Sequence, residues 1–136
     1  MPATDQCEPQ VINALQKEGW EVETRSYPLV AEDAIYYADL RLKSANNQRM
    51  IVVEVKCFPD STTLVEALYR AVGQYLLYEN ILARNEPGAT IYLSIPNHVY
   101  TQIRARESLL SLIKRAKIKL IVVSIETETV EQWLTL

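Results

Sequence analysis

The stretch that decides the fold is IVVEVKCF, residues 51–58. Its run of Ile, Val and Cys predicts a strand in the interior of a sheet, because buried strands are rich in β-branched residues. Glu54 and Lys56 interrupt this apolar pattern. Side chains alternate between the two faces of a strand, so both charges point the same way. These two charges make this strand the first place to look for a functional site.

A second strand is predicted directly before it. Residues 34–43 (AIYYADLRLK) have strand composition, and the linker SANNQ contains Asn46 and Asn47, which can adopt the positive φ angles of a tight hairpin turn. If those two asparagines form the turn, Asp39 lies opposite Glu54 and Tyr37 lies opposite Lys56. The hairpin then brings two carboxylates together on one surface, where Tyr37 could also stack on a base or sugar.

Opposed carboxylates destabilise a sheet unless something compensates their charge. Lys56 is one candidate. A divalent cation is another, since carboxylate oxygens of Asp39 and Glu54 and the backbone carbonyl of Val55 suit Mg²⁺ or Mn²⁺. Such an ion could bind a phosphodiester and activate a water, with Lys56 orienting that water or stabilising the charge on phosphorus. The alternative is an exposed hairpin with ordinary cross-strand ion pairs, and both interpretations stay open at this point.

The rest of the chain predicts one α/β domain over residues 1–136, with a mixed sheet flanked by helices. Hydrophobic periodicity, Pro, Gly and capping residues place the other elements. We expect helices at about 8–18, 64–84 and 101–116, and strands at 20–30, 90–95, 118–125 and 130–134.

The helix over residues 64–84 is the longest. Its expected buried stripe consists of Leu64, Leu68, Val72, Tyr75 and Leu76, which recur at helical spacing. Gly73 is expected to pack closely against the sheet. Gln74 shares a separate stripe with Glu66 and Arg70, and that stripe is either solvated or directed at the site.

The charge composition limits how the protein could bind nucleic acid. The formal charge of −3 and pI near 5.2 argue against binding nucleic acid through overall charge. A basic segment is a solvated helix face or, if it flanks a cleft, a DNA-binding stripe; it contains Arg104, Arg106, Lys114, Arg115, Lys117 and Lys119.

Compartment and cysteine chemistry follow from the same composition. Without a leader or a bilayer-length apolar run, we expect a cytoplasmic protein that does not enter a membrane. We expect Cys7 and Cys57 to be reduced thiols, with Cys57 in the core, and no zinc site.

Asp39 followed by Glu54-Val55-Lys56 and a helix resembles the PD-(D/E)XK motif of the restriction-endonuclease-like superfamily, with Ala38 in place of the usual proline. A resemblance to the fdxN element excision controlling factor family, the XisH-like proteins of cyanobacteria, spans nearly the whole chain. It is carried by VINALQKEGW (11–20), YADL (37–40), VVEVKCF (52–58), GQYLLYENIL (73–82), IYLSIPNHVY (91–100), IKLIVVSI (118–125) and VEQWL (130–134).

This resemblance implies a restriction-endonuclease-like fold and a role in DNA rearrangement beside a site-specific recombinase and a companion excision controlling protein. It further implies metal ligation by Asp39 and Glu54, a lysine role for Lys56, a helix-borne glutamine at Gln74 and an N-terminal helix acid at Glu8. Three functions remain open: an accessory excision factor, an active Mg²⁺-dependent DNA endonuclease, and a catalytically silent interaction module. A homodimer or a basic partner would offset the acidic charge when the protein binds DNA.

Overall fold

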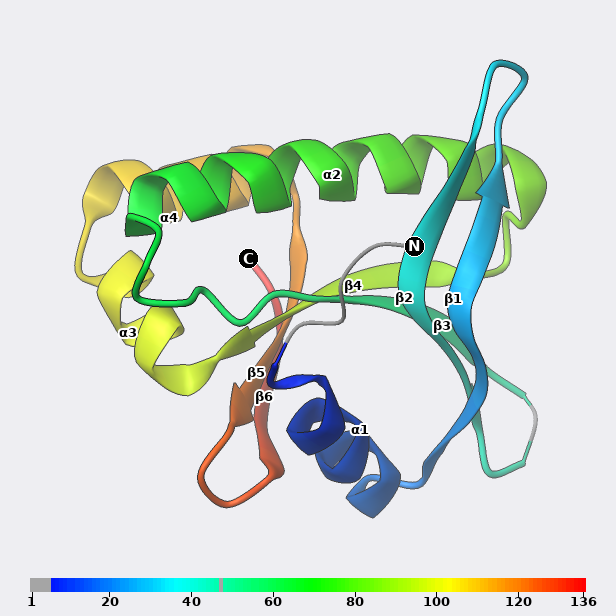
Figure 1. The fold of residues 1–136 in the computed structure, drawn as a ribbon, viewed down its shortest axis with the longest axis horizontal. Coiled ribbons are helices and arrows are strands. Elements are labelled where there is room, and N and C mark those ends of the chain that lie inside the picture. Colours follow the sequence, from blue (N-terminus) through cyan, green and yellow to red (C-terminus); the bar gives the residue numbers. More distant parts are fainter. Residues whose placement is uncertain (1–5, 47) are drawn as a thin grey trace.

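A single six-stranded sheet forms the centre of the computed structural model, which describes residues 6–46 and 48–136 (Figure 1). The strands follow one another in the sheet in chain order: β1 (Trp20–Val30), β2 (Ile35–Ser44), β3 (Met50–Val55), β4 (Thr90–Pro96), β5 (Lys119–Ser124) and β6 (Thr129–Thr135). The central strands β3, β4 and β5 are parallel, and the outer neighbours pair antiparallel. The expected α/β fold with a mixed sheet is confirmed.

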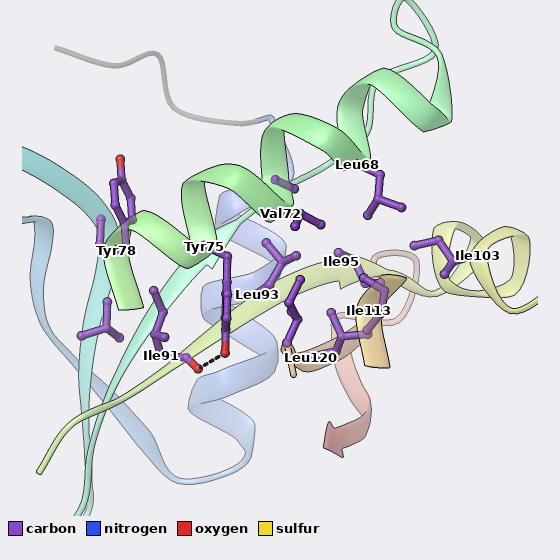
Figure 2. Close-up of a cluster of buried hydrophobic side chains, with 14 of the residues drawn as sticks. Leu68, Val72, Tyr75, Tyr78, Ile91, Leu93, Ile95, Ile103, Ile113 and Leu120 are labelled. Atoms are coloured by element: carbon purple, nitrogen blue, oxygen red, sulfur yellow. Dashed lines mark hydrogen bonds between the residues drawn. The ribbon is translucent and has the colours of Figure 1, made fainter. Parts of the chain in front are cut away.

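Helices cover both faces of this sheet, and they are α1 (Glu8–Lys17), α2 (Leu64–Asn85), α3 (Asn97–Arg104) and α4 (Glu107–Arg115). Helix α1 closes one face over a core that includes Leu40, Val53 and Val55. The other face carries a larger core, in which α2, α3 and α4 contribute apolar side chains (Figures 1 and 2). Both cores exclude water, so the strands between them can carry an uncompensated charge only at high energy.

Tyr75 ties α2 to the sheet. Its hydroxyl donates to the carbonyl of Ile91 at 3.3 Å (Figure 2) and accepts from the backbone N–H of Lys119 at 3.1 Å. Burial raises the pKa of Tyr75 to about 12. The side chain therefore remains a neutral hydrogen-bonding anchor, and it fixes α2 over β4 and β5.

The hairpin register agrees with the prediction. Leu40 lies opposite Val53, and Lys43 lies opposite Met50. The backbone N–H of Ser44 donates to the carbonyl of Arg49 at 2.9 Å, which continues the same register. The predicted turn residue Asn47 lies outside the described residues. Because register sets which residues face each other across the hairpin, this agreement places Asp39 and Glu54 beside each other as predicted.

The predicted helix over residues 101–116 is wrong in its extent. Two helices, α3 and α4, replace it, and Arg106 between them is extended, with φ −116° and ψ 108°. Ile103 and Leu109 are both buried. Six residues of continuous helix would rotate these two side chains onto different faces. The break lets both of them enter the same core.

The expectation of two reduced cysteines is also wrong. Cys7 and Cys57 form a disulfide, with their Cα atoms 5.8 Å apart. The bond joins the residue before α1 to the segment after β3. No local pattern reveals this contact, because the two residues are 50 positions apart in the chain and become neighbours only when α1 packs against the sheet.

Two expectations for α2 are corrected as well. Leu68, Val72 and Tyr75 are buried as predicted, but Leu76 is exposed. Gly73 does not pack against the sheet: a Cβ built there would meet no atom within 4 Å. Positions 73 and 76 lie on the outer side of the helix because the buried stripe continues through Tyr78, Ile81 and Leu82. In the part of the chain that the structure describes, no helix is long and apolar enough to span a membrane.

Candidate functional site

The candidate site lies where β2 and β3 diverge. Leu40 and Val53 form the last backbone pair in this direction, and the next residues are Asp39 and Glu54. The backbone N–H of Asp39 donates to Glu54 Oε1 at 3.1 Å, and the N–H of Val55 donates to Asp39 Oδ2 at 2.8 Å. Each carboxylate thus crosses to the opposite strand and replaces a backbone acceptor. The structure brings the two acids together as the hairpin prediction requires.

Burial gives this pair unusual proton chemistry. Only 3% of Glu54 is exposed. Burial first, and then the negative charge of Asp39, raise the pKa of Glu54 to about 8, although Lys56 opposes the change. Burial also raises the pKa of Asp39. The interaction between the two carboxyl groups lowers the pKa of Asp39 and raises the pKa of Glu54, so it is Glu54 that keeps the proton. At neutral pH the pair therefore holds a proton that a cation could displace.

Lys56 follows the last residue of β3. Its Nζ lies 3.5 Å from Glu54 Oε2, and its side chain is about one quarter exposed. Its backbone N–H donates to the carbonyl of Ser94 at 3.0 Å, so the neighbouring strand β4 fixes the start of the side chain. Lys56 can reach both the buried carboxyl and a group arriving from solvent.

Glu8 and Gln74 form their hydrogen bonds with residues other than Asp39 and Glu54. Glu8, in the first turn of α1, is buried and forms an ion pair with Arg25 at 2.6 Å. Its charge contributes to the raised pKa of Asp39, after burial. Gln74 Nε2 donates to the hydroxyl of Tyr78 at 2.9 Å. Burial raises the pKa of Tyr78, and the charges of Glu54 and Asp39 add to that effect.

Glu66 and Arg70, which share the predicted stripe with Gln74, are exposed. Within residues 6–46 and 48–136 they form no ion pair with each other. The stripe therefore divides: Gln74 faces inward toward Tyr78, and the two charged residues face solvent. Tyr37 is exposed as well, on the divergent part of β2.

The sequence model of a family described as XisH protein matches residues 1–131. The chain belongs to the XisH family. The family resemblance stated from the sequence is thus confirmed, while no curated protein matches the sequence.

Two solved structures share the fold of this XisH family chain. A crystal structure of an XisH family protein from Nostoc punctiforme superposes with a TM-score of 0.87, is 23% identical, and the match covers 95% of this chain and 99% of that one. A crystal structure of an fdxN element excision controlling factor protein from Anabaena variabilis also has a TM-score of 0.87. It is 24% identical, and the match covers 95% of this chain and 98% of that one. The likeness establishes a common architecture.

The donor set fits one class of metal ion. Asp39 Oδ1 and Glu54 Oε2 are the carboxylate oxygens that do not accept the two backbone N–H groups. Mg²⁺ is commonly held by one or two carboxylates together with waters and substrate phosphate. Among the described residues, no group of three His, Cys, Asp or Glu side chains converges. The pair therefore suits Mg²⁺ or Mn²⁺ that keeps its waters, and the Val55 carbonyl stays a predicted third ligand.

Sequence reasoning missed two residues that shape this site. Tyr78 follows Gln74 by one helical turn, so the spacing alone could have placed it beside Gln74. Arg25 had no such signal, because its ion pair with Glu8 depends on how α1 packs against β1. The six basic residues of the predicted stripe take no part in the described contacts of Asp39, Glu54 or Lys56.

Proposed function

We propose that this chain is a DNA-associated excision controlling factor that binds Mg²⁺ or Mn²⁺ between Asp39 and Glu54 and, with Lys56, engages a DNA phosphodiester. The observation that carries the proposal is the pairing of the buried Glu54 carboxyl group with half-buried Asp39, where Glu54 Oε2 lies 3.5 Å from the partly exposed ammonium group of Lys56. Membership of the XisH family supports the role in excision, and one structurally similar protein is described as an fdxN element excision controlling factor.

Different residues of the chain would orient the metal ligands and stabilise charge on the phosphate. The backbone N–H groups of Asp39 and Val55 orient the two carboxylates, so their remaining oxygens are fixed before an ion arrives. A bound divalent ion would supply positive charge to a phosphodiester oxygen. Lys56 lies on the partly exposed side of Glu54, where its ammonium would stabilise negative charge on phosphorus. Tyr78 and Gln74 would support the helix wall of the site.

The position of Lys56 favours a second candidate function, metal-dependent DNA strand cleavage. Its ammonium is close enough to the acids to act on the same phosphate, and a water beside it could be oriented for attack. In either function we propose that a site-specific recombinase and a companion excision controlling protein act with this chain on DNA. The formal charge of −3 supports weak binding of DNA by the isolated chain.

The test is a calorimetric Mn²⁺ titration of the wild type, Glu54→Gln, and the matched control Glu126→Gln, whose side chain is exposed in the turn before β6. We expect one Mn²⁺ site in the wild type and the control, and at least about tenfold weaker binding in Glu54→Gln. Equal binding in all three proteins would refute the site. Absence of Mn²⁺ binding even with duplex DNA present would leave the silent interaction module.

A plasmid assay then separates the two functions. The three proteins are incubated with supercoiled plasmid and Mn²⁺ or Mg²⁺, and nicked product is measured. Metal-dependent nicking that is lost in Glu54→Gln would establish the nuclease. Metal binding without nicking would establish the accessory factor that engages DNA without cutting it.

A further inference from the structure

The outer face of α2 carries apolar side chains where a surface helix is normally polar. Tyr69 is 63% exposed, Leu76 41% and Leu77 40%. Gly73 lies between them on the same face, in open space. Figure 1 shows α2 along the outside of the molecule, with the sheet on its other side. The combination of exposed apolar side chains and a glycine gap indicates a surface that another helix covers.

Charged residues lie at both ends of this face. Glu66 lies near the start of α2 and Arg84 near its end, and both side chains are exposed. Neither takes part in an ion pair with any of the described residues. The face thus has an acid near its start and a base near its end, and neither has an ion-pair partner in the part of the chain that the structure describes.

We propose that α2 pairs antiparallel with α2 of a second copy of this chain, about a two-fold axis near position 75. Such an axis places Glu66 against Arg84 of the second copy and Gly73 against its Leu77. The geometry favours a second copy because one patch supplies both members of each pair, which is the property of a two-fold interface.

Helix dimensions allow these contacts to form together. The distance from position 66 to position 84 along the axis is about 27 Å at 1.5 Å per residue. Helices that cross at about 20° diverge slowly over this length. The long side chains of Glu66 and Arg84 can therefore meet at both ends while Leu77 occupies the gap above Gly73.

The first experiment measures the mass of the full chain in solution by sedimentation velocity over a concentration series. We expect a dimer for the wild type and a monomer for Leu77→Glu. Leu136→Glu is the matched control, because Leu136 is 38% exposed but lies outside α2, and it should remain a dimer. Circular dichroism checks that each variant is folded. A monomeric wild type at about 100 μM would overturn the proposal, because a dimer with a Kd of about 1 μM would be largely assembled at that concentration.

A charge-reversal series tests the predicted pairing itself. Glu66→Arg and Arg84→Glu should each weaken dimerisation by about tenfold or more, because each places like charges opposite one another. The double variant Glu66→Arg with Arg84→Glu restores opposite charges across the two-fold axis and should recover most of the affinity. Failure of the double variant to recover, or a dimer that Leu77→Glu leaves intact, would contradict this arrangement.

Discussion

Glu54 is the residue whose titration should make the stability of this fold depend on pH. Its ordinary pKa is 4.5, and burial together with the charge of Asp39 raises it to about 8 in the folded chain. The folded protein therefore binds one more proton than the unfolded chain between these values. The resulting stabilisation is complete below about pH 4.5 and is lost as pH rises through about 8.

Replacement of Glu54 by Gln should remove this pH dependence. At pH 5 the variant should have nearly the stability of the wild type, because Gln resembles the protonated acid. At pH 9 we expect it to be more stable than the wild type by roughly 2–4 kcal/mol, since it carries no charge to bury. Urea unfolding at pH 5, 7 and 9 measures the difference, with exposed Glu126→Gln as control. An equal difference between variant and wild type at all three pH values would contradict the assignment.

Local sequence patterns were sufficient to predict Asp39, Glu54 and Lys56 as neighbours. Strand alternation and the hairpin register depend on residues within a short segment, and both are visible in the sequence. Arg25 lies beyond that reach. Its pairing with Glu8 arises from tertiary packing of α1, which no periodicity encodes.

Among the elements, α1 depends on the disulfide between Cys7 and Cys57, which closes a long loop containing β1, β2 and β3. Replacing both cysteines by Ser should lower the free energy of unfolding by about 2–4 kcal/mol, because the unfolded chain regains the freedom of that loop. Urea unfolding with and without dithiothreitol measures this. The reductant should lower the midpoint of the wild type and leave the double variant unchanged. A wild type insensitive to the reductant would contradict the structural role of the bond.

Helix α2 depends on its Tyr75 anchor. Tyr75→Phe removes a hydroxyl that bonds to Ile91 and leaves the N–H of Lys119 without its partner. We expect a loss of about 1–3 kcal/mol in stability. Tyr69→Phe on the exposed face of the same helix is the matched control and should change stability by less than about 0.5 kcal/mol. Thermal unfolding of the three proteins decides; similar losses in both variants would rule out the anchor.

The extents of most elements could be predicted, and the failures have physical causes. The edge strand β1 and the buried strand β5 match their patterns because alternation and continuous apolar runs report burial directly. The prediction of one helix over residues 101–116 failed because two short amphipathic helices produce a pattern like that of one longer helix. The prediction for Leu76 failed because a four-residue spacing drifts around a helix of 3.6 residues per turn, which carries Leu76 past the edge of the buried stripe.

At the scale of the whole molecule, the sheet and helices hold the candidate site at one defined place. Strands β2 and β3 separate there, with α1 on one face of the sheet and α2 on the other (Figure 1). Secondary structure alone could predict an α/β fold, but not that α1 brings Glu8 close enough to Asp39 to raise its pKa, or that Glu8 pairs with Arg25 of β1. Those contacts depend on packing between segments far apart in the chain.

The most direct test of the proposed metal site is the pH dependence of Mn²⁺ binding, measured by calorimetry at pH 6, 7, 8 and 9. Because Mn²⁺ must displace the proton on Glu54, affinity should rise by up to about tenfold per pH unit below pH 8 and then level off. At pH 7, titrations in buffers of different ionisation enthalpy should show release of about one proton per ion bound. Mn²⁺ affinity that does not change from pH 6 to 9, or no Mn²⁺ binding at any pH, would contradict a metal site formed by Asp39 and Glu54.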